Sequence, residues 1–357
     1  MLKTKNDLFV IPSKKQTIMH LDMNSYFASC EQQANPSWRG KPVGVCSYLH
    51  PMGTIIAASI EAKALGISTG TKLWEAKLKE PKIILVRDEP TKYRVITERI
   101  RKIITDYTDQ VENYSIDESF LCFHGTDLEL VNEKKKIVKL ALEIKQRIKK
   151  EVGDWLNCSV GIAKTRFLAK VASDYKKPDG LVIIDDKNID SMLRNLSLTD
   201  LWGISRGLKG KLNSLGIFSP LDIKKSSPLF LMKKMGRGGY FLWSRLNALE
   251  VDSRLTRNKT NDKSLGHSYT LIEKTDEKKK LALLFLKLCE KIGRRLRKQN
   301  KVAKTCFIGW KYAYGGGFAC QEKINKITDD SLVIFQIINK HLTRKILAGK
   351  IRKIFVN

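Results

Sequence analysis

Apolar positions in the first 185 residues follow two spacings. Short apolar runs bounded by polar residues are typical of buried strands. Such runs predict strands over 18–23, 43–46, 83–87, 111–123, 157–162 and 181–184. Apolar residues at intervals of three and four predict long amphipathic helices over 91–108 and 130–151. We therefore expect an α+β domain with an inserted subdomain.

The rest of the chain has two further patterns. Residues 189–249 indicate short helices separated by glycine- and serine-containing turns, and so predict a small all-helical domain. Beyond them, residues 253–263 are polar and charged without periodicity, which is typical of a linker. The last segment predicts a β-α-β-β-α-β unit, with elements over 265–271, 280–299, 303–311, 318–324, 330–347 and 351–356.

Composition narrows the class of partner. The 357 residues carry a net charge of +29, and 42% of them are hydrophobic, so the chain is a folded protein suited to a polyanion. Residues 251–357 are the most basic part, with 25 Lys and Arg against 9 Asp and Glu. No apolar run approaches the ~18 residues of a membrane span. We expect no membrane association.

The cysteines and histidines indicate a reducing compartment and no zinc finger. Seven cysteines, an odd number with no C-x-x-C spacing, argue against a disulfide framework and a zinc finger. The five histidines, at 20, 50, 124, 267 and 341, do not cluster along the sequence. Reduced, mostly buried thiols in the cytoplasm are the expected state.

Three carboxylates are candidates for chemistry. Asp22 follows an apolar strand and precedes a helix, where its carboxylate would need a basic side chain or a cation as partner, or would simply be a helix cap or turn residue. Asp117 and Glu118 lie within an apolar and aromatic stretch, although such pairs are often solvated turn residues. Adjacent acids on a regular strand point to opposite faces, so they can share a site only where the chain turns or bulges. Three converging carboxylates would hold Mg²⁺ ions that bridge to phosphate.

Basic residues follow the predicted strand at 157–162. Lys164, Arg166 and Lys170 lie on the next predicted helix, and Lys177 follows at a turn. These cations could meet a triphosphate as point charges. Alternatively, the helix face lies on a nucleic-acid backbone or in water.

A possible phosphate grip lies in the all-helical region. Gly203 and Lys211 belong to two short helices joined by a glycine-containing hairpin, whose backbone N–H groups can hold a phosphate without reading bases. A plain helical turn is the alternative.

These segments, in this order and over nearly the whole chain, resemble the Y-family translesion DNA polymerases. The motifs are Asp-x-Asn-x-Tyr-Phe-Ala-Ser-x-Glu at 22–31, Tyr-Ser-Ile-Asp-Glu at 114–118, Gly-Ile-Ala-x-x-x-x-Leu-Ala-Lys at 161–170, Lys-Pro-Asp-Gly at 177–180, and the helix-hairpin-helix. The 177–180 segment resembles the DinB (polymerase IV) branch. Residues 28–31, 61–66 and 201–204 are more similar to the UmuC (polymerase V catalytic subunit) branch, so the branch stays open.

The resemblance implies a right-hand architecture. The palm would comprise 1–33 and 87–185, the fingers 34–86, the helical thumb with its helix-hairpin-helix 186–250, the linker 251–263 and the C-terminal little finger 264–357. It also implies template-directed synthesis of low fidelity that extends primers past damaged bases. The expected partners are primer–template DNA and dNTPs, with the enzyme acting as a monomer.

The resemblance also implies roles for particular residues. Asp22, Asp117 and Glu118 would be catalytic and would bind two Mg²⁺ ions together with the Met23 carbonyl, so no acid need act as a proton-transfer base. Phe27 matches the steric gate that excludes a ribose 2′-hydroxyl. The triphosphate would face the Tyr26 and Phe27 amides, Lys63 and Lys177. The expected DNA contacts are Lys164, Arg166, Lys170, Gly203 and Lys211.

The chain departs from the family pattern in three places. The fingers often carry Ser-Tyr-Glu-Ala-Arg, whereas here Ile60 and Lys63 replace the tyrosine and the arginine. Lysine supplies charge without a bidentate fork, so we expect weaker nucleotide binding with catalysis retained. Ser205 replaces a hairpin glycine, which weakens the case for phosphate contact there. No sliding-clamp peptide is recognisable at the C-terminal end, so a clamp partner is not supported.

Two other functions fit part of this pattern. A DNA-binding scaffold with an impaired polymerase site would explain Ile60 and Lys63, but not three intact carboxylates. A two-metal nuclease would use the carboxylates and the hairpin, but leaves Phe27 and the triphosphate lysines without a role.

Overall fold

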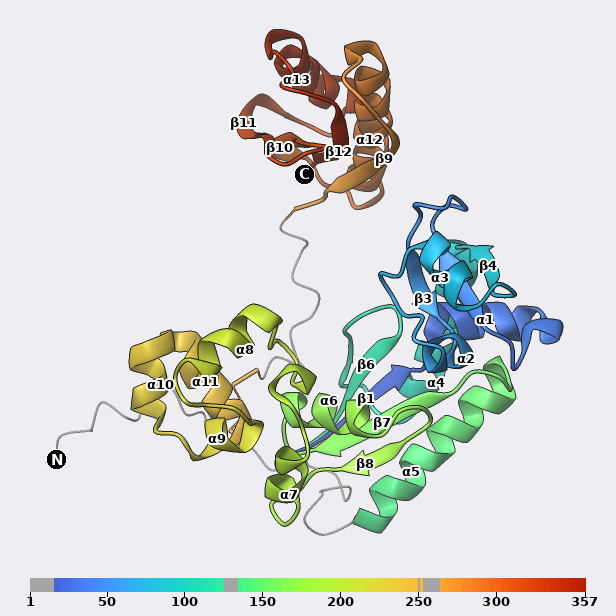
Figure 1. The fold of residues 1–357 in the computed structure, drawn as a ribbon, viewed down its shortest axis with the longest axis vertical. Helices are drawn as coiled ribbons and strands as arrows, with labels where there is room; N and C mark the ends of the chain where they lie inside the picture. Colours follow the sequence, from blue (N-terminus) through green and yellow to red (C-terminus); the bar gives the residue numbers. More distant parts are fainter. Residues whose placement is uncertain (1–15, 125–133, 250, 253–263) are drawn as a thin grey trace. The chain divides into compact units, whose positions relative to one another are not determined.

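The computed structural model describes residues 16–124, 134–249, 251–252 and 264–357. It divides the chain into two compact units, Met1–Thr256 and Arg257–Asn357 (Figure 1). The linker predicted over 253–263 lies outside the described residues. Both units combine helices with sheets, so the predicted α+β class is confirmed.

A five-stranded sheet forms the centre of the first unit, in the order β5-β6-β1-β7-β8. Its strands are β1 (Gln16–Met23), β5 (Val111–Asn113), β6 (Glu118–His124), β7 (Cys158–Ala163) and β8 (Leu181–Ile183). Strand β1 pairs antiparallel with β6 and β7, and β8 runs parallel to β7. The single strand predicted over 111–123 is in fact two strands, because the chain bends at 115–117.

Alternate residues of β1 face two separate cores, because side chains on a strand point to opposite faces. Met19 and Leu21 pack with apolar residues of α4 (Pro90–Thr105) and α5 (Lys134–Arg147). Ile18 packs on the other face with α6 (Arg166–Tyr175). Helix α5 continues into a π-helical turn, Ile148–Val152. The predicted helices over 91–108 and 130–151 are thus confirmed where described; residues 130–133 lie outside the described part.

A smaller three-stranded sheet lies between α1 (Tyr26–Ala34) and α4 along the chain, in the order β3-β2-β4. Its elements are a 3-10 turn (Pro36–Trp38), β2 (Val43–Cys46), β3 (Ile55–Ala58), α2 (Ile60–Ala64), α3 (Leu73–Lys79) and β4 (Ile84–Arg87). Buried Cys46, Ile55 and Leu73 belong to a core of its own. This separate core makes the region an inserted subdomain.

Helices alone make up the described part of 186–249. They are α7 (Ile189–Arg194), a 3-10 turn (Leu198–Asp200), α8 (Arg206–Asn213), α9 (Pro220–Lys225), α10 (Pro228–Met235) and α11 (Arg237–Leu246). Leu212, Leu231 and Leu242 belong to the same core as Phe167 of α6. The helical region therefore packs on the α6 side of the large sheet (Figure 1).

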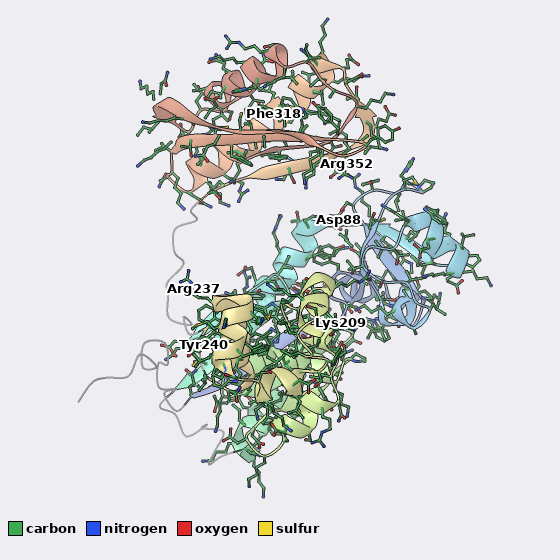
Figure 2. The ribbon with its side chains drawn as sticks, turned by 60° about the vertical axis from the view of Figure 1, so that its left-hand side comes forward. Asp88, Lys209, Arg237, Tyr240, Phe318 and Arg352 are labelled. Atoms are coloured by element: carbon green, nitrogen blue, oxygen red, sulfur yellow. The ribbon has the colours of Figure 1, made fainter. Side chains whose placement is uncertain are left out.

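The second unit has the predicted β-α-β-β-α-β order: β9 (His267–Thr275), α12 (Lys278–Lys298), β10 (Ala303–Tyr312), β11 (Gly317–Thr328), α13 (Ser331–Arg344) and β12 (Ile351–Val356). The sheet is antiparallel in the order β11-β10-β12-β9. Apolar residues of the sheet and both helices form one core. Phe318, labelled in Figure 2, lies with its ring 4.5 Å from that of the buried Trp310.

Two further observations concern the cysteines and the length of the apolar helices. All seven cysteines are free thiols, and six of them are buried. Among the helices that the structure describes, none is both long and apolar enough to cross a membrane.

Candidate active site

The end of β1 places Asp22 at the centre of the large sheet. In the strand register Asp22 lies opposite Glu118 of β6 on one side and Ser159 of β7 on the other. Directly opposed residues of paired strands point to the same face, so Asp22 and Glu118 both project toward α6. Asp22 is only 6% exposed.

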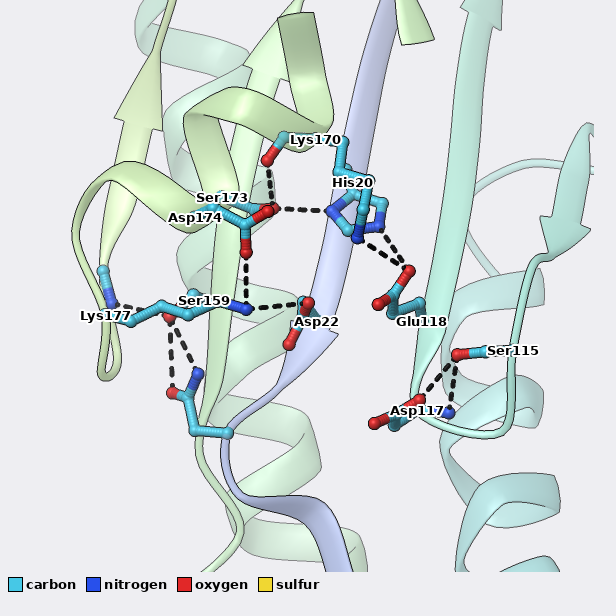
Figure 3. Close-up of polar contacts among 12 residues, drawn as sticks. His20, Asp22, Ser115, Asp117, Glu118, Ser159, Lys170, Ser173, Asp174 and Lys177 are labelled. Carbon is cyan, nitrogen blue, oxygen red and sulfur yellow. Dashed lines mark hydrogen bonds and ion pairs between the residues drawn. The ribbon is translucent and has the colours of Figure 1, made fainter. Parts of the chain in front are cut away.

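The bend before β6 brings Asp117 beside them. Asp117 lies in the bend before the strand, and Glu118 is the first residue of the strand. Their side chains therefore need not point to opposite faces, as those of neighbouring residues within a regular strand do. The Met23 backbone N–H donates to the Asp117 carbonyl at 3.0 Å. The Asp117 carboxylate accepts a 2.6 Å hydrogen bond from the Ser115 hydroxyl (Figure 3). The turn that the sequence required for a shared site is therefore present.

Lys177 is the immediate partner of Asp22. Its Nζ lies 2.8 Å from Asp22 Oδ2 and 2.7 Å from Asp174 Oδ1 (Figure 3). Burial raises the pKa of Asp22 to about 6, and the Lys177 ammonium opposes this shift only in part. A buried carboxylate that remains under-compensated in this way favours a further positive charge nearby.

Glu118 is held by a different pair of residues. Lys170 Nζ lies 2.9 Å from Glu118 Oε2, and His20 Nε2 lies 3.5 Å from the same oxygen. His20 Nδ1 is hydrogen-bonded at 2.7 Å to Ser173 of α6. Burial lowers the pKa of His20, while Lys170 supplies a positive charge beside Glu118. Although burial acts in the opposite direction, these contacts lower the pKa of Glu118 to about 2.

A hydrogen-bonded network fixes the loop that carries Lys177. The Asn24 side chain accepts from the Asp179 N–H at 2.7 Å and donates to Ser159 Oγ at 3.0 Å. Lys145, 9% exposed, donates to the Asp179 carbonyl at 2.6 Å and pairs with its carboxylate at 3.0 Å. The loop position is thus set from the sheet and from α5.

The start of α1 presents two aromatic residues in different ways. Tyr26 is buried, and its hydroxyl donates to the Tyr93 carbonyl at 2.8 Å. Phe27 is half-buried and stacks on the Tyr93 ring, with centroids 4.3 Å apart and 12° between the planes. The Tyr93 hydroxyl donates at 2.6 Å to buried Glu31, which also pairs with Lys92 at 2.9 Å. The stacking partner of Phe27 is therefore anchored at both ends.

Lys63 and Ile60 of α2 face the carboxylates across a cavity of about 470 Å³. Ser59 caps α2, because its side chain accepts from the Ala62 N–H. Burial lowers the pKa of Lys63, and the neighbouring Lys177 lowers it further. The cavity is lined by Asp22, Met23, Asn24, Ser25, Tyr26, Ile56, Ala57, Ala58, Ile60, Lys63, Thr69, Asp117, Glu118, Lys177 and Pro178.

The three predicted cations at 164–170 pair with acids of the same unit, and Lys164 lies just before α6 rather than on it. Lys164 forms an ion pair with Asp186. Arg166 pairs with Glu112 at 2.6 Å and lies 4.4 Å from the centre of the Phe120 ring. Lys170 is 8% exposed against Glu118. Arg166 and Lys170 thus point into the protein, and their predicted DNA contact stays a prediction that this geometry does not favour.

A short turn at 201–205 separates the 3-10 turn Leu198–Asp200 from α8. Gly203 has a φ of +91° and open space around its Cα, a conformation that favours glycine. Ser205 caps α8 by accepting from the Leu208 N–H, which explains the serine at this position. Lys211 lies in the last turn of that helix. Its place can be found in Figure 2 from Lys209, which is labelled there and lies on the same helix.

Several residues of the site were not predicted from the sequence. His20, Ser173 and Lys145 support the carboxylates or the Lys177 loop, and Tyr93 supports Phe27. Each contact joins residues at least 34 positions apart, so no local spacing could reveal it. Polar residues within apolar strands, such as His20, were the available hint.

The fold is that of Y-family polymerases. A Y-family DNA polymerase chimera, Dbh-Dpo4(243-245)-Dbh, superposes with a TM-score of 0.81 at 24% identity, covering 95% of this chain and 97% of the chimera. DinB from Sulfolobus solfataricus gives a TM-score of 0.60 at 23% identity, with the same coverage.

Sequence comparison agrees with the fold. The impB/mucB/samB family matches residues 21–174, and the C-terminal domain of that family matches 262–357. The DNA polymerase IV of Acetivibrio thermocellus is 33% identical over 300 residues, which are 83% of this chain and 73% of the relative. The DNA polymerase IV 1 of Bacillus subtilis is 32% identical over 304 residues, 85% of this chain and 72% of the relative. The chain belongs to the impB/mucB/samB family and is a DinB-like Y-family polymerase.

Proposed function

We propose that this chain is a template-directed DNA polymerase of low fidelity that extends primers past damaged bases. The observation that carries this function is one cavity of about 470 Å³ lined by Asp22, Asp117 and Glu118 on one side and by two lysines. Acidic oxygens and cations around one space suit a metal-bound triphosphate, which needs both. Family membership points to the same reaction.

The carboxylates fit hard cations. All three offer oxygen ligands, the Met23 carbonyl is a possible fourth, and Asp22 is buried with its negative charge only partly compensated. When bound there, two Mg²⁺ ions would lower the pKa of the primer 3′-hydroxyl and neutralise charge as pyrophosphate leaves. Asp22, Asp117 and Glu118 therefore serve as ligands, and none of them needs to act as a proton-transfer base.

Lys177 and Lys63 are the proposed triphosphate contacts. Lys177 is shared between Asp22 and Asp174, so its ammonium can turn toward a phosphate while keeping one carboxylate partner. Lys63 lies across the same cavity. The backbone N–H groups of Tyr26 and Phe27 open α1, where a helix N-terminus favours an anion.

Phe27 is the proposed steric gate. Its ring would lie under the incoming sugar and clash with a ribose 2′-hydroxyl. The stack on Tyr93 holds the ring in place from behind. Ala57 and Ala58 of β3 line the cavity with small side chains, and so would make few contacts with a nascent base pair. Such a wall tolerates the altered shape of a damaged template base.

DNA affinity is proposed to come mainly from phosphate contacts. In the first unit Gly203 and Lys211 belong to the hairpin that would grip a backbone phosphate. In the second unit the face of the sheet opposite the helices carries Lys311, Lys323 and Lys353. Binding should therefore weaken steeply as salt increases. We propose that the chain acts as a monomer, and the free thiols suit a cytoplasmic enzyme.

Primer extension by the full chain tests this function. With Mg²⁺ and four dNTPs, the intact enzyme should extend a primer past an abasic site, and Asp117→Asn should not. Asparagine keeps an oxygen that can accept the Ser115 hydrogen bond, so the bend should survive. The matched control is Asp109→Asn, which changes an exposed acid outside the cavity and should leave extension intact.

Two other outcomes of this experiment would favour the alternative functions. Salt-sensitive DNA binding without extension by the intact protein would favour a scaffold with an impaired site. Shortening of the primer in the absence of dNTPs would favour a two-metal nuclease.

A further inference from the structure

A cluster of three metal-ligand side chains lies in the second unit, far along the chain from the carboxylates. Cys320 and Glu322 are alternate residues of β11 and so point to the same face. His341 reaches them from α13, with its Nε2 3.8 Å from Cys320 Sγ and 2.9 Å from Glu322 Oε1. One ligand atom from each residue lies within 4.8 Å of the other two. The Cys320 sulfur and a Glu322 carboxylate oxygen, both from β11, thus lie close to the same ring nitrogen of His341.

We propose that Cys320, Glu322 and His341 form a binding site for one divalent ion of the Zn²⁺ class. In tetrahedral sites with metal–ligand bonds of 2.0–2.3 Å, neighbouring ligand atoms are about 3.3–3.8 Å apart. The Cys320–His341 distance already has this value. The His341–Glu322 distance is shorter, as expected for a hydrogen bond, and needs to open by roughly half an ångström to match that geometry.

The surroundings permit this adjustment. The Glu322 side chain is 43% exposed and that of His341 is 21% exposed, so both can turn slightly without disturbing the core. Cys320 is half-buried, and the other six cysteines are buried. Three protein ligands leave the fourth position of a tetrahedral ion for water, as in exchangeable zinc sites.

The donor set selects the metal. A thiolate and an imidazole favour Zn²⁺ or Co²⁺ over Mg²⁺, whereas carboxylates and carbonyls in the first unit suit Mg²⁺. The two kinds of site should therefore fill independently from a mixture of ions. A bound ion would join β11, an edge strand of its sheet, to α13.

Cobalt spectroscopy on the full chain tests the proposal. Reduced, chelator-treated protein in excess Mg²⁺ is titrated with Co²⁺, and a thiolate-to-cobalt band in the near ultraviolet should saturate at one equivalent and disappear when Zn²⁺ is added. Cys320→Ser should abolish the band. His341→Gln should weaken Co²⁺ binding at least tenfold. His267→Gln, which changes a histidine on β9 instead, is the matched control and should bind as the parent does.

Two results would overturn the site. One is the absence of a band in the intact protein, which would leave a hydrogen-bonded triad only. The other is a band that persists in Cys320→Ser, which would place the ion on another thiol. If Cys320→Ser does not fold, Glu322→Gln and His341→Gln decide the matter, because both side chains are partly exposed. Unchanged Co²⁺ affinity in both would exclude the site.

Discussion

The two walls of the cavity are built differently. The sheet wall, formed by Asp22, Asp117, Glu118 and Lys177, belongs to the five-stranded sheet and its loops. Each of its side chains has a partner within 3 Å. The α2 wall, formed by Ile60 and Lys63, belongs to a helix of five residues in a separate subdomain.

This contrast separates two properties of the enzyme. In the proposed function the sheet wall holds the metal ligands on which the chemical step depends, and its network of partners leaves little room for substitution. The α2 wall is proposed to contact only the triphosphate, so we expect a change there to alter nucleotide affinity more than the rate of the step. The family motif is intact on the first wall and altered on the second, as this division leads one to expect.

The largest expected effect comes from the sheet wall. Asp22→Asn removes one ligand charge and leaves Lys177 with Asp174 alone, so kcat should fall on the order of 10³-fold. Single-turnover extension at saturating dNTP measures this loss. The matched change Asp174→Asn removes the other partner of Lys177 and should lower kcat only a few-fold. Equal losses in both variants would contradict the assignment of Asp22 as a ligand.

The strands and the acidic residues of the sheet wall could be predicted from the sequence for a clear reason. Buried strands leave continuous apolar runs, and acids that interrupt such runs are conspicuous, as Asp22 is after β1. The same signal failed at 111–123, where apolar residues continue through the bend that separates β5 from β6. Hydrophobicity records burial and does not record where the backbone turns.

Charged residues were harder to place from sequence. Arg166 and Lys170 are four residues apart on α6 and so share one helix face. Sequence alone did not reveal that this face turns toward Glu112 and Glu118. A surface role and an internal ion pair give the same pattern along the chain, and only the packing of α6 on the sheet distinguishes them.

The next effect concerns Phe27, the proposed steric gate, and Tyr93, on which its ring stacks. Because a ring stack is worth about 0.5–1.5 kcal/mol, Tyr93→Leu should raise ribonucleotide use relative to dNTP by up to roughly tenfold. Tyr93→Phe keeps the ring and loses only the hydrogen bond to Glu31, so its discrimination should stay closer to that of the parent. The measured quantity is the ratio of kcat/KM for dNTP to that for rNTP.

The reference for this test is Phe27→Ala, which should relax discrimination more than either tyrosine variant. If Phe27→Ala relaxes it and Tyr93→Leu does not, Phe27 keeps its position without the stack. If neither variant changes the ratio, Phe27 is not the gate.

The smallest expected effect lies on the α2 wall. Lys63→Arg restores a guanidinium that can make two hydrogen bonds to phosphate where the ammonium acts as a point charge. An added hydrogen bond is worth about 0.5–1 kcal/mol here, so KM for dNTP should fall roughly two- to fivefold while kcat stays nearly constant. Lys82→Arg, at an exposed position before β4, is the matched control and should change neither. An unchanged or higher KM in Lys63→Arg would show that the missing fork does not limit nucleotide binding, and that Ile60, which lacks the tyrosine hydroxyl, is the more important departure on this wall.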